Sequence, residues 1–285
     1  MTAVTRISRP VRKTGRAVGD LLEDIGKQLV FYAEIFYEIV TQIIMRLKYR
    51  NVIFNLVSDI TIGAGALIVG GGMVFVIFSM SFFTGTEVGL QGFKGLEQIG
   101  AEAFTGLIGS FANTREVTPL IAGVAFAAQV GAGFTAEIGA MRISEEIDAL
   151  EVMSVPSKTY LVATRVAAAL LAIIPLYLIS LFASFFATKL VTTQFFGLSN
   201  GAYDYYFRLY LPVIDVVFSL VKAAIFAVVV ALIHCYYGYH ASGGPAGVGV
   251  AVGRAIRLSI VSVVVLNLVL SLIFWGGGNT VSLTG

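Results

Sequence analysis

The stretch Val166–Thr188, VAAALLAIIPLYLISLFASFFAT, lies between Arg165 and Lys189 and contains no charged residue. A helix rises about 1.5 Å per residue, so a segment of this length crosses the hydrocarbon core of a bilayer, which is about 30 Å thick. A helix that is apolar on every face lies either in a protein core or in a membrane. The length and composition together favour a membrane-spanning helix.

Four further apolar windows occur along the chain, at residues 60–86, 117–136, 210–234 and 258–274; of these, 210–234 carries Asp215 and Lys222, and the others are uncharged. Over the 285 residues, 57% are apolar and 13% are charged, and the mean hydropathy is +0.88. Soluble domains carry about 25% charged residues, and disordered chains have low hydrophobicity. The sequence therefore predicts an all-α, polytopic membrane protein with five transmembrane helices.

Lysine and arginine are unevenly distributed. Residues 1–50 hold nine of the nineteen, against five acidic residues. With the N-terminus inside, fourteen lie in cytoplasmic segments and four in outer segments, which is the arrangement that membrane proteins favour. We expect a multi-pass protein of the cell membrane with a cytoplasmic N-terminus and an outer C-terminus. No aromatic interleaving or zinc-ligand spacing accompanies the basic start, so no nucleic-acid partner is expected.

Within the N-terminal region 1–50, residues 20–41 have a helical pattern. Apolar side chains recur at spacings of three and four: Leu22, Ile25, Leu29, Tyr32, Phe36, Ile39 and Ile43. Charged residues fall on the other faces. We expect an amphipathic helix that lies in the cytoplasmic membrane interface; a helix packed on a soluble partner is the alternative.

Catalytic and metal-binding patterns are missing from the sequence. Cys235 is the single cysteine, and His234 and His240 are the two histidines, so neither a disulfide nor a metal site is expected. The motifs GxxxxGK[ST], HExxH and GxSxG do not occur. We expect a non-catalytic protein that binds no cofactor itself; if ATP drives it, the ATPase is another chain.

Residues 87–116 are too long for a hairpin and too polar for a full span. Within them, 99–112 is moderately apolar and is interrupted by Glu102, Gly106 and Gly109. This pattern fits a short helix on the outer face or a re-entrant helix.

The second window is preceded by Arg115 and Glu116, which we expect at its outer mouth. Thr118 is suited to cap the helix and Pro119 to occupy its first turn. Arg115 and Glu116 either form functional contacts at this mouth or are solvated end residues.

An acidic segment follows the same window. From 137 to 158 there are five acidic and two basic residues. Ser144 is a plausible cap for a cytoplasmic helix over 144–153, with apolar contacts from Ile147 and Leu150. Acidic segments are repelled by anionic lipid headgroups, so this helix should dock on a basic protein groove; a solvated turn helix is the alternative.

In the fourth window Asp215, Ser219 and Lys222 share one helical face. Charges within a membrane are costly and are candidates for function. They form either a structural ion pair between helices, a substrate contact, or the proton relay of an ion-coupled secondary transporter.

These motifs resemble the MlaE/YrbE permease family of Mce-type ABC lipid transporters. The similarity is carried by Arg115–Pro119, Gln129–Arg142 (QVGAGFTAEIGAMR) and Ser144–Met153 (SEEIDALEVM), with further likeness at 222–226, 238–239 and 253–255. Gln129 and Asn267 stand where the family usually has Arg and Asp, so no ionic role is expected for them. With the basic N-terminal extension, the chain resembles one half of an actinobacterial-type YrbE pair.

The resemblance implies a single permease domain over 51–285 and a coupling helix that inserts into a cytoplasmic ABC ATPase dimer, which binds ATP and Mg. The coupling residues would be Glu145, Glu146, Ile147, Asp148, Leu150 and Glu151. Arg115, Glu116 and Val117 would contact lipid, together with Met80 and Phe83, for which ordinary packing is the alternative. Gln129, Glu137, Asp215 and Lys222 would be structural polar residues within the membrane.

The same resemblance implies the partners. A second MlaE/YrbE permease subunit, identical or homologous, would complete the lipid pathway, and hexameric Mce-domain proteins would cover its outer face. The substrate would be a lipid, fatty acid or sterol.

Overall fold

A computed structural model of the chain describes residues 23, 26–44, 49–63 and 72–276. Helices fill nearly all of this part, and no strand occurs in it. After a helix over 26–38 the elements are η1 (Ile39–Ile44), α2 (Arg50–Thr61), α4 (Gly72–Glu97), η2 (Glu102–Phe104), α5 (Thr105–Ala112), η3 (Asn113–Val117), α6 (Thr118–Phe126), η4 (Ala127–Gly131), α7 (Ala132–Ile143), α8 (Glu146–Val152), η5 (Lys158–Ala163), α9 (Thr164–Leu190), η6 (Val191–Phe195), α10 (Asn200–Leu209), α11 (Val213–Tyr239) and α12 (Gly244–Trp275). The helix η2 is a 3-10 helix, and the other η elements are π-helical. The basic tail before residue 23 lies outside the described residues.

Five helical stretches in the described part are long and apolar enough to cross a membrane: Gly72–Glu97, Glu102–Ile143, Lys158–Phe195, Val213–Tyr239 and Gly244–Trp275. This confirms the predicted all-α, multi-pass architecture. The helices run past the charge-free windows, because charged residues are stable on a helix outside the hydrocarbon core. The first stretch also lies later than the window 60–86, since α2 ends at Thr61 and α4 begins at Gly72.

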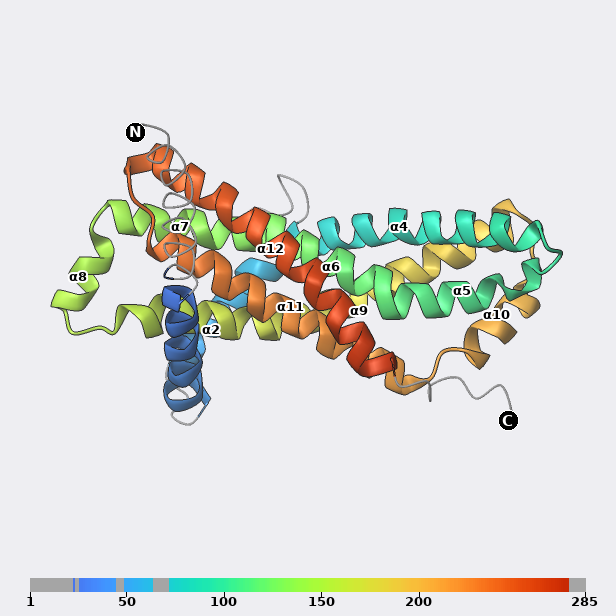
Figure 1. Ribbon diagram of the computed structural model, residues 1–285, viewed down its shortest axis with the longest axis horizontal. Helices are drawn as coiled ribbons and strands as arrows, with labels where there is room; N and C mark the ends of the chain where they lie inside the picture. The colour runs from blue at the N-terminus through green and yellow to red at the C-terminus, as the bar shows by residue number, and fades with distance from the viewer. Residues whose placement is uncertain (1–22, 24–25, 45–48, 64–71, 277–285) are drawn as a thin grey trace, which may run out of the picture.

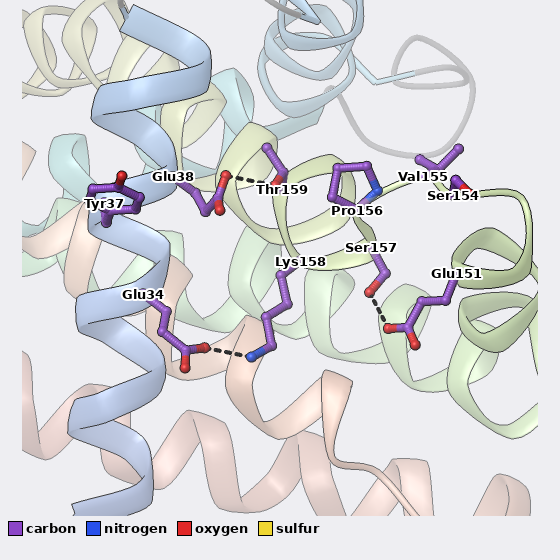
Figure 2. A pocket seen from close by; sticks show the side chains of 10 residues that line it. All are labelled: Glu34, Tyr37, Glu38, Glu151, Ser154, Val155, Pro156, Ser157, Lys158 and Thr159. Atoms are coloured by element: carbon purple, nitrogen blue, oxygen red, sulfur yellow. Dashed lines mark hydrogen bonds and ion pairs between the residues drawn. The ribbon is translucent and has the colours of Figure 1, made fainter.

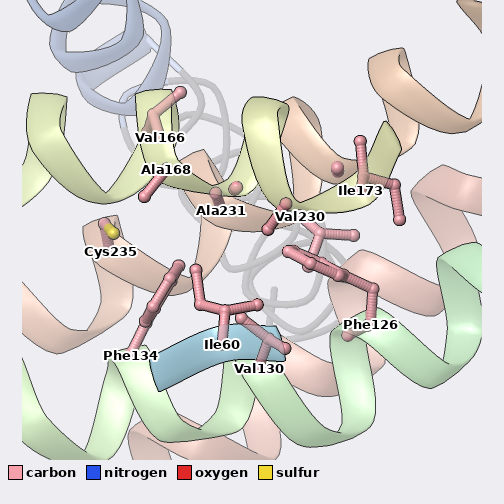
Figure 3. Packing of buried hydrophobic residues seen from close by; sticks show 14 of the residues in the cluster. Ile60, Phe126, Val130, Phe134, Val166, Ala168, Ile173, Val230, Ala231 and Cys235 are labelled. Atoms are coloured by element: carbon pink, nitrogen blue, oxygen red, sulfur yellow. The ribbon is translucent and has the colours of Figure 1, made fainter. Parts of the chain in front are cut away.

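The long stretches form an elongated bundle, which Figure 1 shows with α8 at one end and α5 and α10 at the other. Close contacts between helices need small residues. An added Cβ at Gly85 of α4 would lie 2.4 Å from the carbonyl oxygen of Ser184 in α9. Inside the bundle, Phe126, Val130 and Phe134 pack against α9 and α11, as Figure 3 shows.

Residues 102–143 form one long helical stretch. The helix α5 passes through η3, α6 and η4 into α7 without a break. The expectation that Thr118 caps a new helix is therefore wrong: it makes no cap hydrogen bond, and its buried hydroxyl has no partner among the described residues. Pro119 is accommodated directly after the π-helical turn η3, where the regular hydrogen-bonding pattern has already changed.

The helix over 26–38, which we call the N-terminal helix, lies across the bundle near the α8 end (Figure 1). Phe31 and Ile35 are buried against the bundle, whereas Leu29 and Phe36 are exposed. The side chains that contact the bundle thus include Tyr32, Ile39 and Ile43 of the predicted apolar stripe, together with Phe31 and Ile35, which lie outside it. The exposed apolar side chains are suited to a helix at a membrane interface.

Candidate functional site

A buried ion pair joins η3 to the first turn of α11. The Arg115 guanidinium lies 2.7 Å (Nη2) and 2.8 Å (Nε) from Asp215 Oδ2. The two side chains are 7% and 2% exposed. The guanidinium also lies over the ring of Phe111, 3.6 Å from its centroid, and Trp275 Nε1 donates a hydrogen bond of 2.9 Å to Asp215 Oδ1. Arg115 is therefore buried and paired within the protein.

Lys222 lies two turns after Asp215 on the same face of α11 and is completely buried. Its ammonium donates hydrogen bonds of 2.6 Å to the Arg115 carbonyl oxygen and to Ser271 Oγ. In an α-helix the Arg115 carbonyl would accept from the N–H of residue 119, and Pro119 has none. The lysine thus supplies a donor where residue 119 has none.

Glu116 is the exposed member of the group, with 47% of its side chain accessible. Its carboxylate lies 3.6 Å from Lys222 Nζ and accepts hydrogen bonds from Asn267 Nδ2 (2.7 Å) and Ser271 Oγ (2.5 Å). We refer to Arg115, Glu116, Asp215, Lys222, Asn267, Ser271 and Trp275 as the polar cluster. Its two cations and two carboxylates balance, as buried charges require.

The polar cluster joins residues that sequence reasoning kept apart. Arg115 and Glu116 were expected at the mouth of one span and Asp215 and Lys222 on the face of another, and the structure brings these four together. Ser271 and Trp275 were missed. Their signal is the spacing of four between Asn267, Ser271 and Trp275, which places three polar groups on one face of an otherwise apolar helix.

The other expected lipid contacts lie outside this network. Val117 is half-buried beside Glu116. On α4, Met80 packs against the core and Phe83 is exposed, and neither takes part in the hydrogen bonds and ion pairs of the polar cluster within the described part of the chain.

Gln129 and Glu137 also lie elsewhere. Glu137 forms an ion pair of 3.0 Å with Arg165. Gln129 is exposed and lines a hollow of about 220 Å³ together with Glu137 and Asp59.

The predicted acidic helix is present as α8, at one end of the bundle (Figure 1). Ile147 is fully buried and anchors it, whereas Val152 is 87% exposed. Ser144 is not its cap: the hydroxyl donates to Ala140 O at the end of α7, and the position before α8 is Glu145, at φ 63°. The helix begins at Glu146, two residues after the expected start at 144, because the chain turns through the left-handed region at Glu145.

The acidic side chains of this segment divide into two groups. Glu145 and Glu146 are exposed, and Glu146 contacts only the Ser144 hydroxyl (2.9 Å) among the described side chains. Asp148 pairs with Arg142 at 2.8 Å, and Glu151 accepts a hydrogen bond of 2.8 Å from Ser157. Leu150 packs against the core beside them.

A cleft of about 630 Å³ separates α8 and the start of η5 from the N-terminal helix (Figure 2). Three carboxylates line it, Glu34, Glu38 and Glu151, with Lys158 as its cation. Lys158 Nζ lies 2.5 Å from Glu34 Oε2, and Thr159 donates to Glu38 at 2.9 Å. These contacts hold the N-terminal helix beside the acidic segment.

Comparison with known proteins agrees with this architecture. The sequence pattern of the family described as Permease MlaE matches residues 62–273. A probable ABC transporter permease protein of Rickettsia bellii is 34% identical over 200 residues, covering 70% of this chain and 77% of the relative. One from Synechocystis is 31% identical over 199 residues, covering 70% and 76%.

A plant protein is also similar. Protein TRIGALACTOSYLDIACYLGLYCEROL 1, chloroplastic, of Arabidopsis thaliana is 30% identical over 198 residues, covering 69% of this chain and 56% of the relative. The family match spans the first four candidate membrane helices completely and the fifth up to residue 273. The chain belongs to the MlaE permease family and is a multi-pass permease subunit of an ABC transport system.

Proposed function

We propose that the chain is the permease of an ATP-driven lipid transport system and that α8 docks on a separate ATPase, which binds ATP and Mg. The observation that carries this proposal is the position of α8. It lies at one end of the bundle, is anchored by the buried Ile147, and presents Glu145, Glu146 and Val152 to the surroundings. An exposed acidic and apolar surface suits a basic groove with an apolar floor.

The α8 end is the cytoplasmic end in this proposal. Basic residues favour the cytoplasmic side, and Arg142, Lys158, Arg254 and Arg257 belong to the segments at this end. The N-terminus then lies in the cytoplasm and the C-terminus outside, in the cell membrane. A second permease subunit, identical or homologous, completes the pathway, and hexameric Mce-domain proteins cover its outer face.

The polar cluster supplies the headgroup contact. Arg115 is committed to Asp215, so Glu116 is the charged group of the cluster that a ligand can reach. Its carboxylate favours a headgroup that donates hydrogen bonds, such as one bearing hydroxyl or amino groups. Val117, Met80 and Phe83 offer apolar surface for acyl chains. The name of the plant relative, which is that of a glycolipid, supports a lipid substrate.

Docking is tested by reversing Glu145 and Glu146 to lysine in the chain co-expressed with its ATPase. These two carboxylates have no ion-pair partner among the described residues, so their reversal leaves the Arg142–Asp148 pair intact. The matched control reverses Glu87 and Glu97 on α4, which are also exposed. We expect the ATPase to be lost from the purified complex only with the first pair; retention in both would contradict docking at α8.

Transport is tested in proteoliposomes that contain the whole complex and a fluorescent lipid. We expect lipid movement to require ATP and to fall in Glu116→Gln, with the complex intact. Movement without ATP that follows an imposed proton gradient would instead support the ion-coupled secondary transporter using Asp215 and Lys222.

A further inference from the structure

A second hollow at the α8 end, of about 420 Å³, lies between the N-terminal helix, the end of α11 and the first turns of α12. The polar side chains that line it are Gln28, Tyr236, Tyr237, His240, Ser242 and Arg254. It is separate from the polar cluster, whose residues belong to η3, the start of α11 and the last turns of α12.

The charge in this hollow is positive. Arg254 is exposed, and no carboxylate of the described residues pairs with it. Neither Asp nor Glu is among the described residues that line the hollow. The cleft of Figure 2, by contrast, carries three carboxylates. An unpaired guanidinium in a hollow without carboxylates is suited to an anion, and its planar set of donors matches a phosphate.

The rest of the lining adds donors and an aromatic wall. Tyr32 donates to the Gln28 amide oxygen, which leaves the amide nitrogen of Gln28 as a donor, and Ser242 adds a hydroxyl. The ring of Tyr236 lies 4.4 Å from that of His240 and 5.3 Å from that of Phe31. His240 Nδ1 lies 2.9 Å from the Tyr236 carbonyl, which only accepts, so Nδ1 carries the proton.

The position of the hollow indicates the source of the anion. Tyrosines at the end of an apolar helix mark the membrane interface, and the N-terminal helix beside them exposes Leu29 and Phe36. Val250 and Ala251 of α12 give the hollow an apolar side. A phospholipid offers both a phosphate and an apolar body at this depth, whereas free phosphate offers only the first.

We propose that this hollow binds the phosphate headgroup of an anionic phospholipid in the membrane leaflet at the α8 end. The bound lipid bridges the N-terminal helix to α11 and α12. The site is distinct from the polar cluster and does not rest on the proposed function.

The test measures lipid binding to the full-length chain in detergent by native mass spectrometry, with dioleoyl-phosphatidylglycerol as the probe. Arg254→Gln removes the guanidinium, and Arg257→Gln is its matched control, because Arg257 is also exposed on α12 but does not line the hollow. Losing charged hydrogen bonds should weaken binding about tenfold or more in Arg254→Gln and leave Arg257→Gln near wild type.

Two further probes distinguish a phospholipid from a free phosphate compound as the source of the bound anion. Dioleoylglycerol, which has no phosphate, should not bind this site, and glycerol 3-phosphate should compete only weakly because it lacks the apolar body. Equal binding by Arg254→Gln and wild type, or an equal loss in both arginine variants, would overturn the site. Strong binding of glycerol 3-phosphate without retention of the phospholipid would overturn the lipid source.

Discussion

The Lys222 ammonium donates a hydrogen bond of 2.6 Å to the carbonyl oxygen of Arg115, the carbonyl four residues before Pro119, which has no N–H to donate. One residue on α11 therefore donates directly to the backbone of another membrane helix. The same ammonium reaches Ser271 on α12, so three helices meet at a single nitrogen.

Lys222→Met should destabilise the protein by about 1–3 kcal/mol, because it removes the buried ammonium that donates to the Arg115 carbonyl and to Ser271. Thermal unfolding in detergent measures this change. Lys94→Met, at an exposed lysine of α4, is the control and should change stability little. Equal melting temperatures of Lys222→Met and wild type would contradict this role of Lys222.

Arg115→Met should cost about 3–5 kcal/mol, because it leaves the Asp215 carboxylate buried and uncompensated. The double variant Arg115→Met/Asp215→Leu should recover most of that loss, since neither charge remains. Trp275 is the single tryptophan of the chain and contacts Asp215, so its fluorescence reports directly on the cluster. If the stability loss of the double variant equals the sum of the two single losses and the Trp275 emission is unchanged, the two residues are not coupled.

Gly85→Ala should destabilise the α4–α9 contact by about 1–3 kcal/mol, because the new methyl group would overlap the backbone of Ser184. Gly95→Ala on the same helix has open space and should be neutral or stabilising by up to about 1 kcal/mol. Unfolding in a denaturing detergent series compares the two. Identical effects would contradict the close approach.

Gly131→Ala should be destabilising because its Cβ would lie 2.5 Å from Cδ2 of His234, a ring held by Thr135 at 2.7 Å. The cost should shrink when His234→Ala is combined with it, with a coupling of about 0.5–3 kcal/mol. Gly133→Ala, which has nothing within 4 Å, is the control in the same thermal assay. Additive effects of the Gly131 and His234 substitutions would contradict this close contact.

Tyr203 gives a prediction for alkaline pH. Burial raises the pKa of its hydroxyl, which has no hydrogen-bond partner among the described residues. The folded state therefore favours the protonated form, and this contribution to stability is lost as pH rises above the ordinary tyrosine pKa of about 10. Tyr203→Phe should have the same melting temperature as wild type at pH 7 and should lose less stability at alkaline pH. Equal losses of stability in both proteins would contradict this role of Tyr203.

The number of membrane helices could be predicted because long uncharged segments have few alternatives to a membrane. Helix ends could not, because a charged residue such as Lys94 limits the hydrocarbon-spanning part and not the helix itself. Pro119 was misleading for a related reason: it commonly begins a helix, but here a π-helical turn precedes it and a lysine from another helix supplies the missing donor.

The polar cluster was predictable only in parts. The pattern on α11 placed Asp215 and Lys222 on one face, and the family resemblance singled out Arg115 and Glu116. Which charge pairs with which depends on how the helices are packed, and a single sequence contains no direct record of that packing. Trp275 lies one residue beyond the predicted window 258–274, although its indole completes the site.

The unbroken helix between Arg115 and Ile143 is about 40 Å long at 1.5 Å per residue. It joins the polar cluster at one end to the turn that carries α8 at the other. Such a rod acts as a lever: a tilt of about 5° displaces one end relative to the other by about 4 Å, more than the length of any hydrogen bond in the cluster. Its π-helical turns η3 and η4 are the places where that displacement can be absorbed or passed on.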